Sequence, residues 1–96
     1  MEFDGNVMRV QGRLTLETSP ALFAQGLPVK DGLTDIVIDL AKVEGVDSSA
    51  ISLMLAWLRA AQAKQLKLSF VNVPENLISL ANLYDVTETL SLPANN

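Results

Sequence analysis

An aspartate and two serines stand immediately before the most apolar segment of the chain. Asp47, Ser48 and Ser49 precede the run at residues 50–58, in which Ser52 is the only polar residue. A hydroxyl group at the start of a helix lies where free N–H groups and the helix dipole favour a phosphate. The same side chains can instead cap the helix and do no chemistry. The residue types therefore permit a phosphorylation site at Ser48 without requiring one.

Four carboxylates lie close together in sequence around the same segment. They are Asp35, Asp39, Glu44 and Asp47. Magnesium and calcium ions prefer clustered oxygen ligands of this kind. Asp35 and Asp39 flank a predicted strand, however, while the other two lie in a predicted loop, so solvated surface charges are the simpler interpretation. We expect neither a metal site nor a cofactor.

The composition argues against catalysis. The chain has no histidine and no cysteine, which removes the commonest general base, the thiolate nucleophile and the softer metal sites. Its glycines fit neither a phosphate-binding loop nor a dinucleotide-binding fingerprint, and no Ser-x-x-Lys spacing occurs. We therefore predict that the protein is not an enzyme.

The charges and apolar runs also limit the partners and the location. The net charge is −4 at pH 7 and the basic residues are scattered, so nucleic-acid binding is not expected. The first residues lack the basic and then apolar pattern of a secretory signal. The run at 50–58 is much shorter than the about 20 residues that cross a bilayer. We expect one cytoplasmic domain over residues 1–96, with no direct membrane insertion.

Apolar periodicity and turn signals predict the elements that must hold these residues. The alternation in VMRVQGRLTL predicts two strands joined by a tight turn at Gln11 and Gly12. Ser19 before Pro20 predicts the N-cap and start of a short helix. The remaining elements are a strand, a long helix, a strand and a final helix, at residues 33–40, 48–64, 66–73 and 74–84. This order predicts an α/β domain whose later strands are parallel and joined by right-handed crossovers.

The long helix predicted at 48–64 has two distinct faces on a helical wheel of about 100° per residue. One arc, which we assign to the sheet, carries Ala50, Ile51, Met54, Trp57, Leu58 and Ala61. The opposite arc carries Ser48, Ser52, Arg59 and Gln62, with Leu55, Ala56 and Ala63 among or beside them. A leucine set among small and hydroxyl-bearing residues favours a docking patch for another protein over an ordinary solvated surface.

The stretch DIVIDLAKVEGVDSSAISLML resembles the core of the STAS domain family. In that family a hydrophobic strand ending in Asp-Leu is followed by a loop and by Asp-Ser-Ser at the head of an apolar helix. VQGRLTLETSPALF is similar to the family's first hairpin and short helix, and LKLSFVNVPENLISLANLYDVTETL to its last strand and helix. The resemblance covers nearly the whole chain. It implies an α/β STAS fold, with a mixed sheet of four to five strands, an N-terminal hairpin and helices packed mainly on one face.

Two branches of the STAS family imply two kinds of partner. In the anti-sigma factor antagonists, such as SpoIIAA, the first serine after the aspartate is phosphorylated by an anti-sigma factor kinase; here that serine is Ser48. In the MlaB branch, the domain docks on the MlaF-like ATPase subunit of an ABC transporter, which moves phospholipid and maintains outer-membrane lipid asymmetry. No phosphate is required for that docking. The MlaB resemblance implies a cytoplasmic protein that is peripherally associated with the inner membrane through its partner.

Several residues favour the MlaB branch. The motif Leu-Ala-x-Leu-Tyr, at residues 80–84 here, is typical of MlaB-like chains, and Ala50 stands where the sigma antagonists usually have glycine. Ser48-Ser49 replaces the Thr-Gly of MlaB, which leaves phosphorylation open. The resemblance and the wheel together assign partner binding to Asp47, Ser48, Ser49, Ser52, Leu55 and Arg59. No residue is assigned to catalysis or to metal binding.

Overall fold

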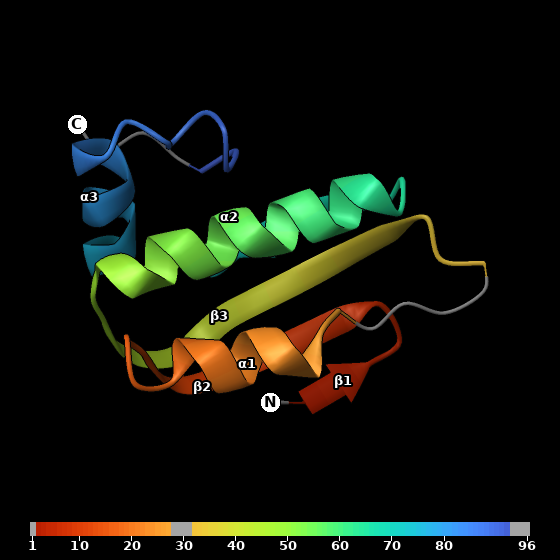
Figure 1. The fold of residues 1–96 in the computed structure, drawn as a ribbon, viewed down its shortest axis with the longest axis horizontal. Coiled ribbons are helices and arrows are strands. Elements are labelled where there is room, and N and C mark those ends of the chain that lie inside the picture. The colour runs from red at the N-terminus through yellow and green to blue at the C-terminus, as the bar shows by residue number, and fades with distance from the viewer. Residues whose placement is uncertain (1, 28–31, 93–96) are drawn as a thin grey trace.

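The computed structural model describes residues 2–27 and 32–92. Its elements follow the order predicted from the sequence (Figure 1). They are β1 (Glu2–Asp4), β2 (Val7–Leu14), α1 (Ser19–Gln25), β3 (Asp35–Val46), α2 (Ser48–Ala63), β4 (Lys67–Val71) and α3 (Glu75–Leu83). None of these helices combines the length and the apolar character that a membrane crossing requires.

The four strands form one mixed sheet in the order β1-β2-β3-β4. β1 and β2 are antiparallel, whereas β2, β3 and β4 run parallel. Parallel neighbours need a crossover connection, and α1 and α2 supply the two that are required. The α/β fold predicted from the sequence is therefore confirmed, with four strands among the described residues.

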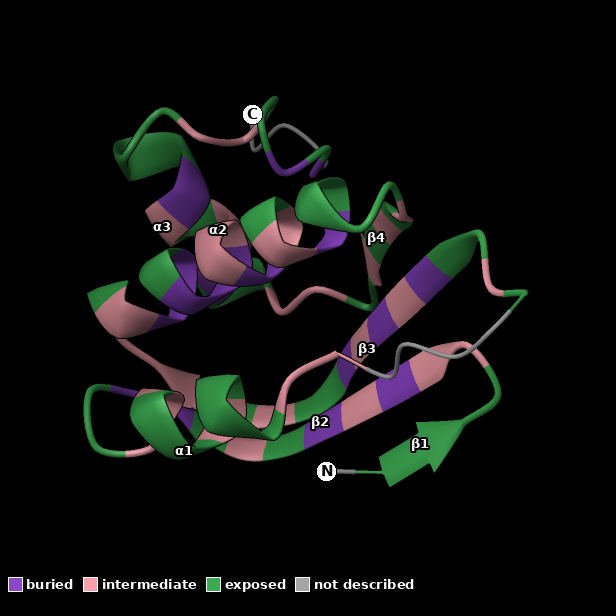
Figure 2. Cartoon of the chain, turned by 45° about the vertical axis from the view of Figure 1, so that its right-hand side comes forward, coloured by how far each residue is buried: buried purple, intermediate pink, exposed green. Residues whose placement is uncertain are grey.

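Burial alternates along the central strand β3. Ile36, Ile38 and Leu40 are fully buried, whereas Asp35 is exposed and Asp39 is half-buried. Successive side chains of a strand point to opposite faces of the sheet. One face therefore carries the core beneath the helices, and the other face is turned to solvent across the described strands. Figure 2 shows the buried bands along β2 and β3.

The turn predicted at Gln11 and Gly12 is wrong. β2 runs through both residues, and the hairpin closes earlier, at Gly5 and Asn6, where Gly5 adopts a φ of 61°. Gly12 has a φ of 85° and lies where the register between β2 and β3 shifts. A glycine inside a strand marks a bulge as readily as a turn. The alternation alone does not distinguish the two, so the predicted hairpin lies too far along the chain.

Two element ends also differ from the predictions. β3 continues to Val46, beyond the predicted residue 40, because its second half pairs with the second half of β2 across the shifts in register. The N-cap of α1 is Thr18 and not Ser19. The Thr18 hydroxyl donates to the Arg13 carbonyl at 2.7 Å and accepts from the Thr15 N–H at 2.9 Å. These bonds close a turn one residue before the predicted cap.

The buried face of α2 is close to the one that the wheel predicts. The residues of α2 that are buried are Ala50, Ile51, Leu53, Met54, Trp57 and Ala61. Leu53 was not assigned to the core, and Leu58 is only half-buried. The wheel allowed only for packing on the sheet, whereas α1 and α3 also contact α2. Leu53 lies in the same core cluster as Leu77 and Ala81 of α3.

Candidate partner-binding site

The Asp47 side chain holds the head of α2. Asp47 is the N-cap, with an extended backbone, and its Oδ1 accepts a hydrogen bond from the Ser49 N–H at 2.8 Å. Its Oδ2 accepts another from the Leu16 N–H at 3.1 Å. The Asp47 N–H in turn donates to the Leu14 carbonyl at 3.2 Å. Asp47 therefore caps α2 and ties it to the loop between β2 and α1.

These hydrogen bonds lower the pKa of Asp47 below its ordinary value of 3.8. The largest cause is the Leu16 N–H; the backbone and side chain of Ser49 and the charge of Arg13 act in the same direction, and burial opposes them. Donors to a carboxylate favour its charged form. Asp47 is therefore ionised wherever the fold is intact at neutral pH.

We expect Asp47 to contribute to a loss of stability in acid. A carboxylate whose pKa is lower in the folded than in the unfolded chain stabilises the fold above its unfolded pKa of about 4, and this contribution is lost as the pH falls through the folded pKa. Asp47→Asn should therefore lower the unfolding temperature at neutral pH and make its decline in acid shallower. Thermal unfolding followed by circular dichroism over this pH range measures both effects. Parallel declines in the variant and the wild type would contradict this role.

A hollow of about 470 Å³ lies between the outward face of α2 and the residues that follow α3. It is lined by Ser48, Ser49, Ile51, Ser52, Leu55, Tyr84 and Val86. Ser48 and Ser52 are exposed, and Leu55 is half-buried. The lining therefore presents hydroxyl and apolar groups, and no acidic or basic side chain, to a partner. We call this depression the α2 hollow.

The structure divides the predicted binding residues into three groups. The three serines and Leu55 share the α2 hollow. Asp47 does not line it, since its carboxylate is engaged with the two backbone N–H groups that position the helix. Arg59 is exposed one turn beyond Leu55 and lies outside the lining. Asp47 thus positions the residues of the candidate site without lining the α2 hollow itself. Arg59 lies at the edge of the candidate site.

Tyr84 and Val86 are lining residues that the sequence analysis did not assign to binding. Tyr84 is half exposed, at 50%. Asp85 adopts a φ of 58°, and the Val86 N–H donates to the Ala81 carbonyl at 3.0 Å. This cap turns the chain back toward α2. The tyrosine of the Leu-Ala-x-Leu-Tyr motif was the available signal, but a left-handed turn on an aspartate has no clear sequence signature.

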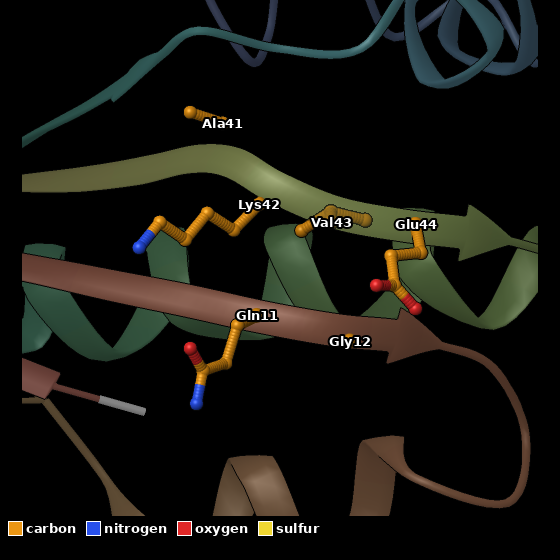
Figure 3. Close-up of a pocket in the computed structure, with 6 residues that line it drawn as sticks. All are labelled: Gln11, Gly12, Ala41, Lys42, Val43 and Glu44. Atoms are coloured by element: carbon orange, nitrogen blue, oxygen red, sulfur yellow. The ribbon is translucent and has the colours of Figure 1, made fainter.

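A different hollow, of about 540 Å³, lies on β2 and β3, where the register shifts. Figure 3 shows its lining residues, which are Gln11, Gly12, Ala41, Lys42, Val43 and Glu44. Gly12 contributes no side chain to this hollow, and the bulge separates the neighbouring side chains from one another. We attribute this hollow to the backbone irregularity and assign no function to it.

Three of the four candidate magnesium ligands, Asp35, Asp39 and Asp47, have separate hydrogen-bond partners. Asp35 accepts from the Asn6 side chain at 3.1 Å. Asp39 accepts from the Ala41 N–H at 2.9 Å and from the Asn72 side chain at 3.1 Å, and these donors lower its pKa. Over residues 2–27 and 32–92, no three His, Cys, Asp or Glu side chains gather closely enough to hold a metal ion. The bonds of Asp39 instead fix the bulge in β3.

The order of elements, the one-sided sheet and the Asp-Ser-Ser helix head can be compared with known proteins. A family model described as Mlab, STAS domain matches residues 1–93. The chain belongs to this STAS domain family. The fold of the STAS domain is also found in the crystal structure of a sulfate transporter family protein from Wolinella succinogenes. That structure superposes with a TM-score of 0.73 at 12% identity, over 88% of this chain and 70% of the other. No curated protein matches the chain.

Membership of the STAS family confirms the resemblance inferred from the sequence. STAS domains are generally non-catalytic, and they commonly mediate contacts between proteins. The likeness to the Wolinella protein is at low identity and bears on the fold alone. The α2 hollow therefore lies on a domain of a kind that commonly binds other proteins.

Proposed function

We propose that this STAS protein is an MlaB-like subunit that binds and regulates the ATPase of an ABC transporter for phospholipid trafficking and outer-membrane lipid asymmetry. The supporting observation is the α2 hollow, in which Ser48, Ser52 and Leu55 face the same space as Tyr84. A depression lined by hydroxyl and apolar groups suits a protein surface, because it can be desolvated without burying an unpaired charge.

The proposed role is regulation through binding and involves no reaction on this chain. The domain would contact the MlaF-like ATPase through the α2 hollow, with Arg59 at the edge of the contact. It would stabilise whichever conformation of the ATPase presents the complementary surface, since a ligand shifts an equilibrium only by its different affinity for the two states. The protein would then lie at the cytoplasmic side of the inner membrane through this partner, and would bind neither nucleotide nor lipid itself.

The second candidate function is that of an anti-sigma factor antagonist that is phosphorylated on Ser48. The observation in its favour is that Ser48 is exposed and opens α2 immediately after the cap. A phosphate there would add negative charge next to the Asp47 carboxylate, which already accepts from the Ser49 N–H. Phosphorylation would therefore repel a partner more readily than it would order this surface.

A binding experiment with Ser48→Ala separates the two functions. The wild-type and variant proteins are titrated with a purified Mla-type ATPase subunit, and with an anti-sigma factor kinase in the presence of labelled ATP. We expect the ATPase to bind both proteins with dissociation constants within about threefold, because removal of one exposed hydroxyl changes little. Phosphate incorporation into the wild type that disappears in Ser48→Ala, together with no binding to the ATPase, would favour the kinase partner and overturn our proposal.

A further inference from the structure

Leu16 is an exposed leucine on a loop that hydrogen bonds hold in place. Its side chain is 72% exposed, between the end of β2 and the start of α1. The Thr18 hydroxyl accepts from the Thr15 N–H at 2.9 Å, and the Ser19 N–H donates to the Thr15 carbonyl at 2.9 Å. The Leu16 N–H itself donates to the Asp47 carboxylate at 3.1 Å. The backbone of the loop is therefore fixed, while the loop presents an apolar side chain to water.

Leu16 lies beside the head of α2, next to the α2 hollow. β2 and β3 run parallel, and their last residues, Leu14 and Val46, are partners in the register. Leu16 and Ser48 each follow two residues later. The Asp47 carboxylate joins the Leu16 N–H to the first turn of α2. Figures 1 and 2 both show the loop between β2 and α1 at the same end of the molecule as the head of α2.

The α2 hollow alone is too small for a specific contact between two proteins. Seven residues line it, whereas a standard interface takes about 20–30 residues and about 800 Å² from each partner. The contact must therefore spread beyond the hollow. Along α2, the outward residues after Leu55 include Arg59 and Gln62, which are exposed and polar. Interface centres are poor in charge and rich in apolar groups, so an apolar neighbour such as Leu16 suits the centre, and Arg59 suits the rim.

We propose that the contact with the ATPase crosses the head of α2 and includes Leu16, which enters an apolar pocket of the partner. This inference rests on the proposed function and names a further residue of the same contact. Because the loop is already ordered by its hydrogen bonds, little conformational freedom is lost when the partner binds Leu16. The Asp47 carboxylate also fixes the leucine relative to the serines of α2. The ATPase therefore meets the loop and the α2 hollow as one surface.

The test compares Leu16→Ala with Leu16→Met in a titration of the purified Mla-type ATPase subunit. Leu16→Ala should weaken binding about tenfold or more, as truncation of an anchor residue does, whereas Leu16→Met keeps the apolar volume and should recover most of the affinity. Neither change should affect folding measurably, because the side chain is exposed. Phe3→Ala is the control: Phe3 is 47% exposed and pairs with Met8, toward the other end of β2. It should leave binding unchanged.

The outcomes distinguish this inference from the proposed function. If the wild type binds and Ser52→Glu weakens binding, but Leu16→Ala binds as tightly as the wild type, the inference is overturned and the proposed function stands. Equal weakening in Phe3→Ala and Leu16→Ala also overturns the inference, because the effect is then not specific to the head of α2. Light scattering of the chain alone tests a second copy as the occupant, and a dimer that Leu16→Ala converts to a monomer overturns the inference as well. A wild type that does not bind the ATPase overturns both.

Discussion

Ser52→Glu is expected to weaken binding to the proposed ATPase partner by about a hundredfold or more, while the protein itself stays folded. Ser52 is exposed and lines the α2 hollow, so a longer side chain there meets no core residue. In the complex, the new carboxylate would be buried among hydroxyl and apolar groups with no cation in the lining. An uncompensated buried charge costs on the order of 3–5 kcal/mol, and about 1.4 kcal/mol corresponds to a factor of ten in affinity.

The measurement is a titration of the purified ATPase subunit with each variant, with circular dichroism as the test of folding. Leu55→Glu should have the same effect on binding, but it also costs stability because Leu55 is half-buried against the core. Ser69→Glu is the matched control: Ser69 is exposed on β4 and alternates with the half-buried Leu68 and Phe70. If Ser69→Glu weakens binding as much as Ser52→Glu does, the contact is not at the α2 hollow.

The sequence was sufficient to predict α2 and its surroundings because two independent signals agree there. The apolar residues recur with the helical period, and Asp47 stands at the position where a cap is needed. The structure has the helix start at Ser48, as predicted, and five of the six residues assigned to the core are buried. The serines and Leu55 then fall on the outward side by geometry alone. Long elements with strong periodicity are the ones that local pattern determines.

The position of the hairpin could not be predicted in the same way. Nor could the side of the α2 hollow that is formed by Tyr84 and Val86. The sequence predicts a turn at Gln11 and Gly12, but Gly12 lies at a bulge, whose position depends on the pairing of β2 with β3 and therefore on residues distant in sequence. Val86 reaches the hollow because the chain turns at Asp85, which adopts a left-handed conformation that most aspartates do not adopt. Both features are decided by tertiary packing, so neither has a signature in a single sequence.

Trp57→Ala is expected to lower the free energy of unfolding by about 3–5 kcal/mol, the typical cost of truncating a buried aromatic side chain. Trp57 is fully buried and is the largest side chain in the core. Its removal leaves a cavity beneath α2 that the sheet and the neighbouring helices cannot fill without moving. Single domains are stable by only about 5–15 kcal/mol. Urea unfolding followed by circular dichroism should therefore show a variant that is close to unfolding at 37 °C.

Trp57→Phe separates the loss of volume from the loss of the indole N–H. The Nε1 atom of Trp57 is buried and has no hydrogen-bond partner among residues 2–27 and 32–92. Phenylalanine removes this unsatisfied donor and keeps most of the apolar volume, so it should cost less than half as much as alanine. Arg59→Ala, two residues along and exposed, should change the stability by no more than about 0.5 kcal/mol. If Trp57→Phe instead destabilises as much as Trp57→Ala, the indole N–H has an acceptor, and a polar contact at Nε1 holds α2 in place together with the apolar core.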